Sequence, residues 1–285
     1  MKTLRDTRFG EERALYGARD VYLINCRFDG EEDGESALKE AQDVIVEDTY
    51  CNLRYPFWHD RALVLRKTEM TEACRAPLWY SEDVKAFDCV MHGVKALREC
   101  RDVCLERCDV RSPEFGWSTS DVSVLDCRAE GEYFMLRAER LAMRGTHFCG
   151  KYSFQYIKDA VIEDCILDTK DAFWHAENVT VRNCTVKGEY LAWYSKNLTM
   201  IDCKIIGTQP FCYCTGLLLE NCEMIDTDLA FERSEVMASI TTPVLSIKNP
   251  YAGNISVPSV GELIMDDPRA LGTVSLEPPC AQQTN

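Results

Sequence analysis

Aromatic side chains with polar neighbours recur at a fixed place in this sequence. Trp174 is followed by His175, and Trp193 by Tyr194, nineteen residues further along the chain. Indole and phenol rings combine apolar surface with an N–H or O–H group, which suits sugars with their apolar ring faces and hydroxyl rims. The simpler alternative is that these rings fill the core. We name Trp174, His175, Trp193 and Tyr194 as candidate ligand-binding residues, with an oligosaccharide as the candidate partner.

Four carboxylates flank the same segments and are weak catalytic candidates: Asp171, Glu189, Asp228 and Glu232. Asp171 and Glu189 occupy similar positions in neighbouring repeats, so their separation could approach the roughly 5–9.5 Å of glycosidase carboxylate pairs. With 47 acidic residues in the chain, chance alignment is the simpler explanation. Gly-rich phosphate loops, serine elbows and zinc-binding helix motifs are not found. Whether the protein is an enzyme stays open.

The sixteen cysteines reveal the element that positions these residues. A spacing of 19 connects seven of them, namely Cys89, Cys108, Cys127, Cys165, Cys184, Cys203 and Cys222. Threonine takes the same place at Thr7, Thr49, Thr68 and Thr146, which a metal or redox role would not obviously tolerate. The series therefore predicts a column of buried, reduced thiols. Neither a metal site nor a cofactor is predicted.

Apolar residues repeat around each position of this cysteine ladder. They stand five and three residues before it and two residues after it, as Val179, Val181 and Val186 do around Cys184. Alternation of this kind indicates short strands with one buried face. Asn, Asp or Gly directly precedes most ladder residues and favours a bend with positive φ. The sequence therefore predicts an all-β, right-handed parallel β-helix with three strands per rung.

The repeat also sets the predicted boundaries. About twelve rungs run from Thr7 to Cys222, so that residues 1–235 form the β-helix. Shorter strands over residues 236–268 should close its end, because terminal rungs expose unpaired edges. Residues 269–285 read as a tail that is partly disordered.

The candidate ligand-binding residues fall on the third, aromatic-rich strand of each rung. His175, Tyr194, Tyr213 and Glu232 each follow a ladder residue by ten positions, and His59 does so in an earlier rung. Rungs stack at about 4.8 Å, so these side chains should form one column. Every second residue of a strand points outward, but the preceding turn leaves open which of the aromatic residues do so.

Charge and hydropathy narrow the possible partners. The net charge of −15 argues against nucleic acid and anionic membrane surfaces as partners. The sequence has no run of 18 apolar residues, so no membrane-spanning helix is predicted. The segment Met1–Gly10 is charged and lacks the apolar stretch of a secretory signal, so we expect a cytoplasmic protein. The oligomeric state is left open.

Four stretches of the chain resemble an uncharacterised bacterial family, a domain of unknown function with a pectate-lyase-like β-helix. They are FWHAENVTV at Phe173–Val181, GEYLAWYSKNLT at Gly188–Thr199, IIGTQPFCYC at Ile205–Cys214 and DTDLAFERSE at Asp226–Glu235. The resemblance implies the fold and a bacterial origin but no activity. The catalytic motifs of polygalacturonases and pectate lyases, which share this fold, are not recognisable.

Two functions remain after these observations. The first is a carbohydrate-binding or carbohydrate-processing protein that uses the aromatic third face. The alternative is a non-catalytic scaffold whose surface binds other proteins. Outward Trp174 and Trp193 rings in an acid-lined groove would favour the first, whereas inward rings and a flat polar face would favour the second.

Overall fold

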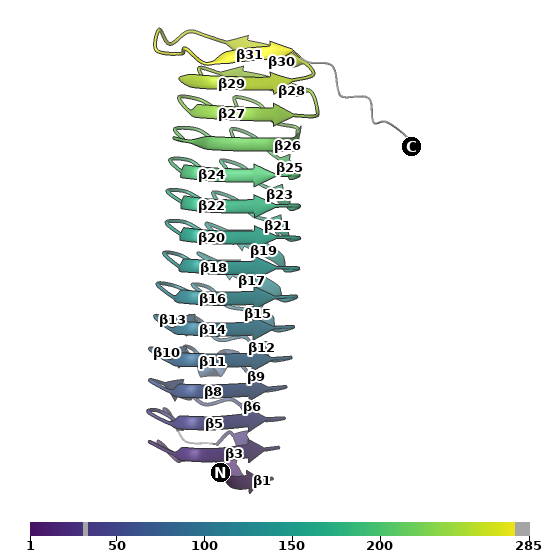
Figure 1. Cartoon of the computed structure of the whole chain (residues 1–285). Helices are drawn as coiled ribbons and strands as arrows, with labels where there is room; N and C mark the ends of the chain where they lie inside the picture. The colour runs from purple at the N-terminus through teal and green to yellow at the C-terminus, as the bar shows by residue number, and fades with distance from the viewer. Residues whose placement is uncertain (31–33, 277–285) are drawn as a thin grey trace. The chain divides into compact units, whose positions relative to one another are not determined.

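The computed structural model describes residues 1–30 and 34–276. The chain is an all-β parallel β-solenoid with a repeat of about 19 residues and about 14 turns, which confirms the predicted fold class (Figure 1). Two compact units, Met1–Gly150 (unit 1) and Lys151–Asn285 (unit 2), divide it. No helix in the described ranges is long and apolar enough to cross a membrane.

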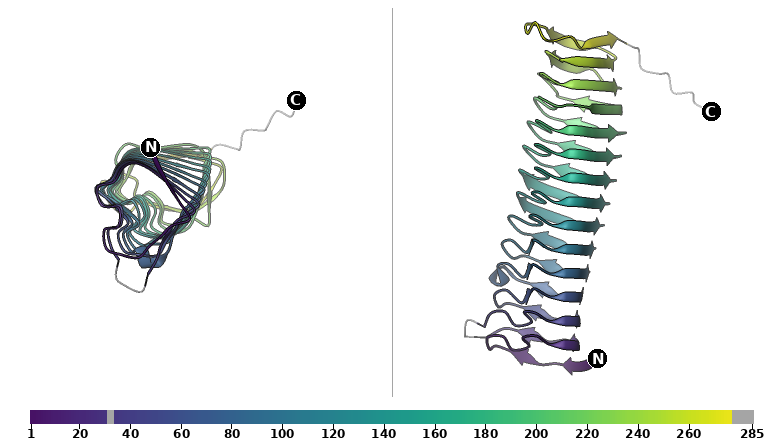
Figure 2. Two further views of the ribbon diagram at one scale, coloured as in Figure 1. Left: turned by 90° about the horizontal axis from the view of Figure 1, so that it is seen from below. Right: turned by 60° about the vertical axis from the view of Figure 1, so that its left-hand side comes forward.

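Unit 1 stacks its rungs through two parallel ladders of strands (Figure 2). The first ladder consists of β1 (Lys2–Arg5), β3 (Arg19–Ile24), β5 (Gln42–Glu47), β8 (Arg61–Arg66), β11 (Glu82–Phe87), β14 (Arg101–Glu106), β16 (Ser120–Leu125) and β18 (Glu139–Arg144). The second ladder consists of β2 (Arg8–Phe9), β4 (Arg27–Phe28), β6 (Tyr50–Cys51), β9 (Glu69–Met70), β12 (Val90–Met91), β15 (Asp109–Arg111), β17 (Arg128–Glu132) and β19 (His147–Lys151).

Unit 2 repeats this arrangement. The first ladder continues with β20 (Lys158–Glu163), β22 (Glu177–Arg182), β24 (Lys196–Ile201), β26 (Leu217–Ile225), β27 (Glu235–Ile240), β29 (Ala252–Val257) and β31 (Thr273–Leu276). The second ladder continues with β21 (Ile166–Asp168), β23 (Thr185–Lys187) and β25 (Lys204–Ile206), and β26 pairs with both β24 and β25. The strands β28 (Val244–Lys248) and β30 (Val260–Ile264) pair with each other in a separate sheet.

The end of unit 2 adds turns that the cysteine spacing does not reveal. β27 pairs in parallel with both β26 and β29, and β31 pairs in parallel with β29. The spacing changes here, since Val236 pairs with Gly253 only 17 residues later, and no thiol marks the register. β31 thus forms inside the segment expected to be a tail, of which residues 277–285 lie outside the described part.

The inward side chains match the predicted pattern. The ladder cysteines are buried and form no disulfides. Val179, Val181 and Val186, which surround Cys184 in the sequence, are buried in the core as well. The Cys184 thiol donates to the carbonyl oxygen of Arg182 at 3.1 Å. Burial raises the pKa of core thiols such as Cys74 and Cys100 to about 12, so that they stay protonated at neutral pH.

Bends with positive φ separate the two ladders of strands. Asn183 and Asp202, each directly before a ladder cysteine, have φ of 49° and 52° as predicted. Asn183 Nδ2 also donates to Asp164 Oδ1 of the preceding rung at 2.7 Å. A second bend lies six residues before the ladder position, for example at Asp121 (φ 57°).

The third side of each rung is less regular than predicted. In unit 1, only the two-residue strands β7 (Phe57–Trp58), β10 (Leu78–Trp79) and β13 (Leu97–Arg98) form this side among the described residues, and a 3-10 turn at Glu72–Cys74 leads into it. In unit 2 the same segment alternates its backbone, with positive φ at Asp171, Phe173 and His175. Main-chain hydrogen bonds still join neighbouring rungs, as from His175 N to Trp193 O at 2.9 Å.

Candidate functional site

Because the backbone conformation of the third side alternates, successive side chains there are buried, half-buried and exposed in turn. Phe173 is buried, Trp174 is half-buried, His175 is exposed and Ala176 is buried again. This order replaces the strict alternation expected of a strand, because every second residue has left-handed φ. The next rung repeats it with Ala192, Trp193, Tyr194 and Ser195.

Four rings of unit 2 form one stacked column, which we call the outer ring column: the exposed Tyr156, His175 and Tyr194 and the half-buried Tyr213. Successive ring centroids lie 4.7, 5.0 and 4.8 Å apart, and the planes are within 12° of parallel. Tyr156 and Tyr194 are each 43% exposed. The predicted neighbourhood of His175, Tyr194 and Tyr213 is confirmed. Since neighbouring rings cover one another's faces, the surface consists of ring edges, phenol hydroxyls and an imidazole.

The two tryptophans form a second stack beside this column. The Trp174 and Trp193 rings lie 5.4 Å apart with planes 3° from parallel. Each indole N–H donates to a carbonyl oxygen of the next rung, Trp174 Nε1 to Tyr190 O at 2.6 Å and Trp193 Nε1 to Gln209 O at 2.8 Å. The indoles therefore offer half-buried apolar surface, with their N–H groups already bonded.

Glu232 lies one position away from the predicted column. The Phe231 and Phe211 rings stack with centroids 5.7 Å apart, so these two residues occupy equivalent positions in neighbouring rungs. Glu232 is therefore equivalent to Cys212 and not to Tyr213. Arg233 stands where His175 and Tyr194 stand in their rungs, because the turn before Leu229 holds one extra residue. The Glu232 carboxylate lies 3.3 Å from Lys248 Nζ. Burial and the nearby Glu232 charge raise the pKa of Tyr213.

Of the four acidic candidates, the structure brings only Asp171 and Glu189 together. Asp171 N donates to Glu189 O at 3.0 Å, and the Asp171 side chain is buried. Burial raises the pKa of the Asp171 carboxyl; Lys170 lowers it and Glu189 raises it further. Glu189 itself lies 2.9 Å from Lys170 Nζ. A raised carboxyl pKa suits a general acid, but a catalytic role for this pair stays a prediction.

Asp228 lies apart from that pair. Its carboxylate accepts a short hydrogen bond from the Thr208 hydroxyl, and its main-chain oxygen accepts from Gln209 N at 2.9 Å. Within the described ranges, no three His, Cys, Asp or Glu side chains converge as a metal site would require.

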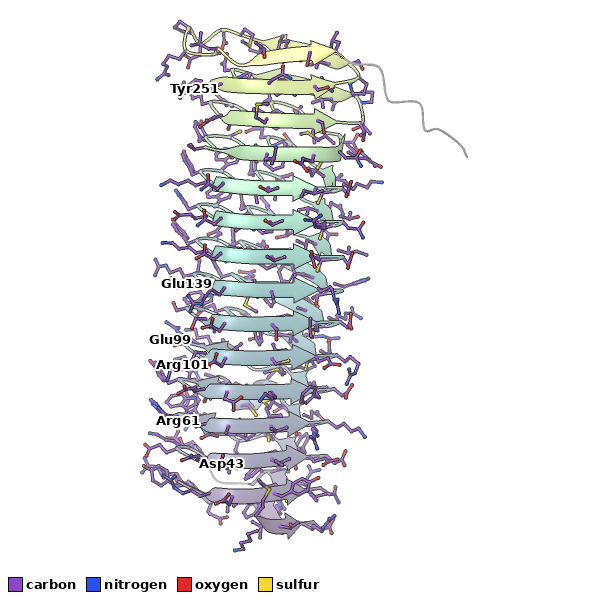
Figure 3. The ribbon with its side chains drawn as sticks, in the orientation of Figure 1. Asp43, Arg61, Glu99, Arg101, Glu139 and Tyr251 are labelled. Carbon is purple, nitrogen blue, oxygen red and sulfur yellow. The ribbon has the colours of Figure 1, made fainter. Side chains whose placement is uncertain are left out.

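Unit 1 contains a group of side chains of which sequence reasoning named only His59. A depression of about 460 Å³ is lined by His59, Arg61, Tyr80, Ser81, Glu82, Glu99 and Arg101. Arg61 and Arg101 begin strands β8 and β14, and Glu99 follows β13, so the three lie along one edge of the unit (Figure 3). The signal that points to them is the recurrence of Phe-Trp-His at residues 57–59 and 173–175.

Stacked parallel rungs with outward rings define the chain as a β-solenoid protein that displays an aromatic face. It belongs to the family described as "Protein of unknown function (DUF3737)", whose model matches residues 2–274. No curated protein matches the sequence.

Solved structures with similar folds come from several sources. The A-module of Azotobacter vinelandii mannuronan C-5 epimerase AlgE4 matches with 10% identity and a TM-score of 0.44, covering 84% of this chain and 88% of that one. The Streptococcus pneumoniae surface adhesin PfbA matches with 9% identity and a TM-score of 0.41, covering 86% and 70%. Similarity at this level says nothing about function.

Proposed function

We propose that the protein binds oligosaccharides on the aromatic third face of unit 2, through Trp174, His175, Trp193 and Tyr194. The observation that carries this proposal is the outer ring column, whose edges, hydroxyls and imidazole repeat at 4.7–5.0 Å. A chain of sugar hydroxyls lying along the column would meet a hydrogen-bonding group at every rung. The half-buried indoles beside it supply apolar surface for C–H groups.

The test compares binding with stability in the full chain. His175→Ala and Tyr194→Ala should each weaken binding at least tenfold to whichever oligosaccharide a broad glycan panel reveals, measured by titration calorimetry. The melting temperature should change little, because both side chains are exposed. Ile166→Ala, at an exposed apolar residue of β21 away from the rings, is the matched control and should bind like the parent.

Two results would contradict the proposal. Variants that lose the roughly 3–5 kcal/mol typical of buried aromatic truncation would show that the column is a structural wall. A parent protein that binds nothing on the panel would remove the basis for a glycan site.

One observation favours the alternative, a non-catalytic scaffold. The stacked rings cover one another's faces, and the indole N–H groups are occupied, so that sugar rings have no open ring face along the middle of the column. A row of edges and hydroxyls also suits a flat protein surface rich in tyrosine. Capture of a specific protein partner that the Tyr194→Ala variant fails to bind, together with an empty glycan panel, would support this second function.

A further inference from the structure

Unit 1 repeats the ring arrangement of unit 2. Residues 57–59 and 173–175 both read Phe-Trp-His, and residues 79–81 and 193–195 both read Trp-Tyr-Ser. In each unit the two segments lie on neighbouring rungs, since Trp58 pairs with Trp79 and His175 N bonds to Trp193 O. We call the resulting two indoles, imidazole and phenol a ring quartet.

The two quartets agree in geometry. Trp58 and Trp79 stack at 5.0 Å with planes 10° apart, as Trp174 and Trp193 do at 5.4 Å and 3°. The His59 and Tyr80 rings stack at 4.9 Å and 14°, as those of His175 and Tyr194 do at 5.0 Å and 8°. Both unit 1 indoles also donate to carbonyl oxygens of the next rung, Trp58 Nε1 to Ala76 O at 2.6 Å and Trp79 Nε1 to Lys95 O at 3.2 Å.

A hollow lies on either side of the unit 1 quartet. The depression of about 460 Å³ borders the His59 and Tyr80 rings. A second one, of about 250 Å³, borders the indoles and is lined by Tyr55, Trp58, Arg75, Ala76, Trp79, Val94 and Lys95. The rings therefore form a ridge between a polar and a more apolar hollow. Concave surfaces of this kind are typical of ligand-binding sites.

The charges around this ridge are unlike those of the chain as a whole. The two hollows are lined by four basic side chains and two acidic ones, Arg61, Arg75, Lys95, Arg101, Glu82 and Glu99. The hollow beside His59 and Tyr80 has two arginines and two glutamates, so its charges balance, and the positive excess of the ridge comes from Arg75 and Lys95 beside the indoles. Lys95 is ion-paired with Glu114 at 3.2 Å. Even a balanced hollow stands out in a chain whose net charge is −15. In unit 2 the position of Arg61, two residues after the histidine, is held by Glu177.

The arginines keep donors available for a ligand. Arg61 and Arg101 each direct one NH2 group to Glu82 Oε2, at 3.4 and 2.6 Å, while 68% and 57% of their side chains stay exposed. A guanidinium has five N–H donors, so donors remain on both residues for a bidentate carboxylate. Glu99 is itself opposed by Arg98 at 3.4 Å, which reduces its repulsion of an anion.

We propose that the unit 1 quartet is a second binding site, and that it takes acidic oligosaccharides whose sugar carboxylates bind Arg61 and Arg101. This inference rests on the proposed function, because it assigns the same kind of ligand to a repeated set of rings. One chain then holds two sites, of which the site in unit 1 prefers charged saccharides.

The experiment uses the full chain with hexagalacturonate and its methyl ester, which carries the same sugars without the charges. We expect the parent to bind the acid at least tenfold more tightly at unit 1 than the ester. His59→Ala and Tyr80→Ala should abolish acid binding, and Arg61→Gln should weaken it at least tenfold while leaving ester binding unchanged. Arg182→Gln, which removes an exposed arginine of unit 2 outside both quartets, is the control and should bind like the parent.

The outcomes separate this inference from the proposed function. Acid binding that responds only to His175→Ala and Tyr194→Ala overturns the second site and supports the first. Acid binding that responds only to the unit 1 variants supports the second site. If, in addition, no glycan on the panel responds to His175→Ala or Tyr194→Ala, the assignment to unit 2 is overturned. Equal affinity for acid and ester, together with unchanged acid binding by Arg61→Gln, overturns the carboxylate specificity. Binding of neither hexamer, with an empty glycan panel, overturns both proposals.

Discussion

Asp60 is the one aspartate buried to 1% in unit 1 among the described residues, in a row of small side chains that points into the core. Its Oδ1 accepts from Ala41 N at 3.0 Å, whereas Oδ2 has no hydrogen-bond partner. Burial raises the pKa of this carboxyl well above its usual range, and no basic side chain opposes the effect. Asp60 is therefore protonated in the folded protein under conditions where an unfolded chain would release the proton.

This difference makes stability depend on pH. Below about pH 4, the ordinary pKa of aspartate, the folded and unfolded chains both hold the proton. As the pH rises from there to the raised folded pKa, only the folded chain holds it, so the free energy of unfolding falls. Asp60→Asn keeps an acceptor for Ala41 N but has no proton to lose. Its stability relative to the parent should therefore grow between pH 5.5 and pH 8, by up to about 1.4 kcal/mol per pH unit.

Urea unfolding at several pH values measures this growth. The control is Asp102→Asn, at an exposed aspartate of β14, which should follow the parent at every pH. A constant difference between Asp60→Asn and the parent across the range would mean that the carboxyl is charged in the folded state.

At the scale of the elements, close contact between rungs decides where glycine is needed. Gly188 has φ of +154°, and a Cβ placed there would lie 1.5 Å from Thr169 O of the preceding rung. Gly17 also has positive φ, +64°, but a Cβ there would meet nothing within 4 Å. An alanine at Gly17 would therefore meet backbone strain alone, whereas an alanine at Gly188 would also collide with the neighbouring rung.

Gly188→Ala should therefore lower the free energy of unfolding by about 3 kcal/mol or more, since the rungs must move apart. Gly17→Ala should cost only about 1–2 kcal/mol, the penalty for a left-handed residue with a side chain. Urea unfolding of both variants provides the comparison. Equal losses would show that rung spacing at Gly188 tolerates a methyl group.

The sequence predicts the elements wherever one residue type marks the register. Buried thiols such as Cys184, and bends such as Asn183, follow from the spacing because each rung repeats the same local geometry. The bend at Asp121 is missed, since an aspartate within a strand reads as an outward polar residue. The shift of Glu232 is missed as well. The extra residue lies after Cys222, the last ladder residue, so the cysteine spacing does not reveal it.

The candidate site is predicted in part for the same reason. Counting ten residues from the ladder places His175 and Tyr194 in one column, as the structure shows. Counting does not tell which rings point outward, because that depends on the alternating φ of the third side. It also does not find the hollows around Arg61, which depend on side chains from three rungs.

At the scale of the whole molecule, a solenoid is stabilised mainly by contacts between neighbouring rungs, whose buried side chains together form its core. Val181 lies in β22 with 0% exposure, and it pairs with Ile162 of β20 and Met200 of β24. An unpaired carboxylate at this place costs several kcal/mol. Because each rung depends on its neighbours, the defect should spread along the stack and weaken with distance.

Hydrogen exchange of the Val181→Asp variant tests this expectation strand by strand. Protection should be lost in β20, β22 and β24 first, and retained longest in the rungs most remote from β22 in sequence. Thr180→Asp, at the half-buried neighbour on the outward face, is the control and should change stability by no more than about 0.5 kcal/mol. Loss confined to β22 would show that rungs fold independently, and equal loss in every strand would show that the chain unfolds as one cooperative unit; either result contradicts coupling between nearest neighbours.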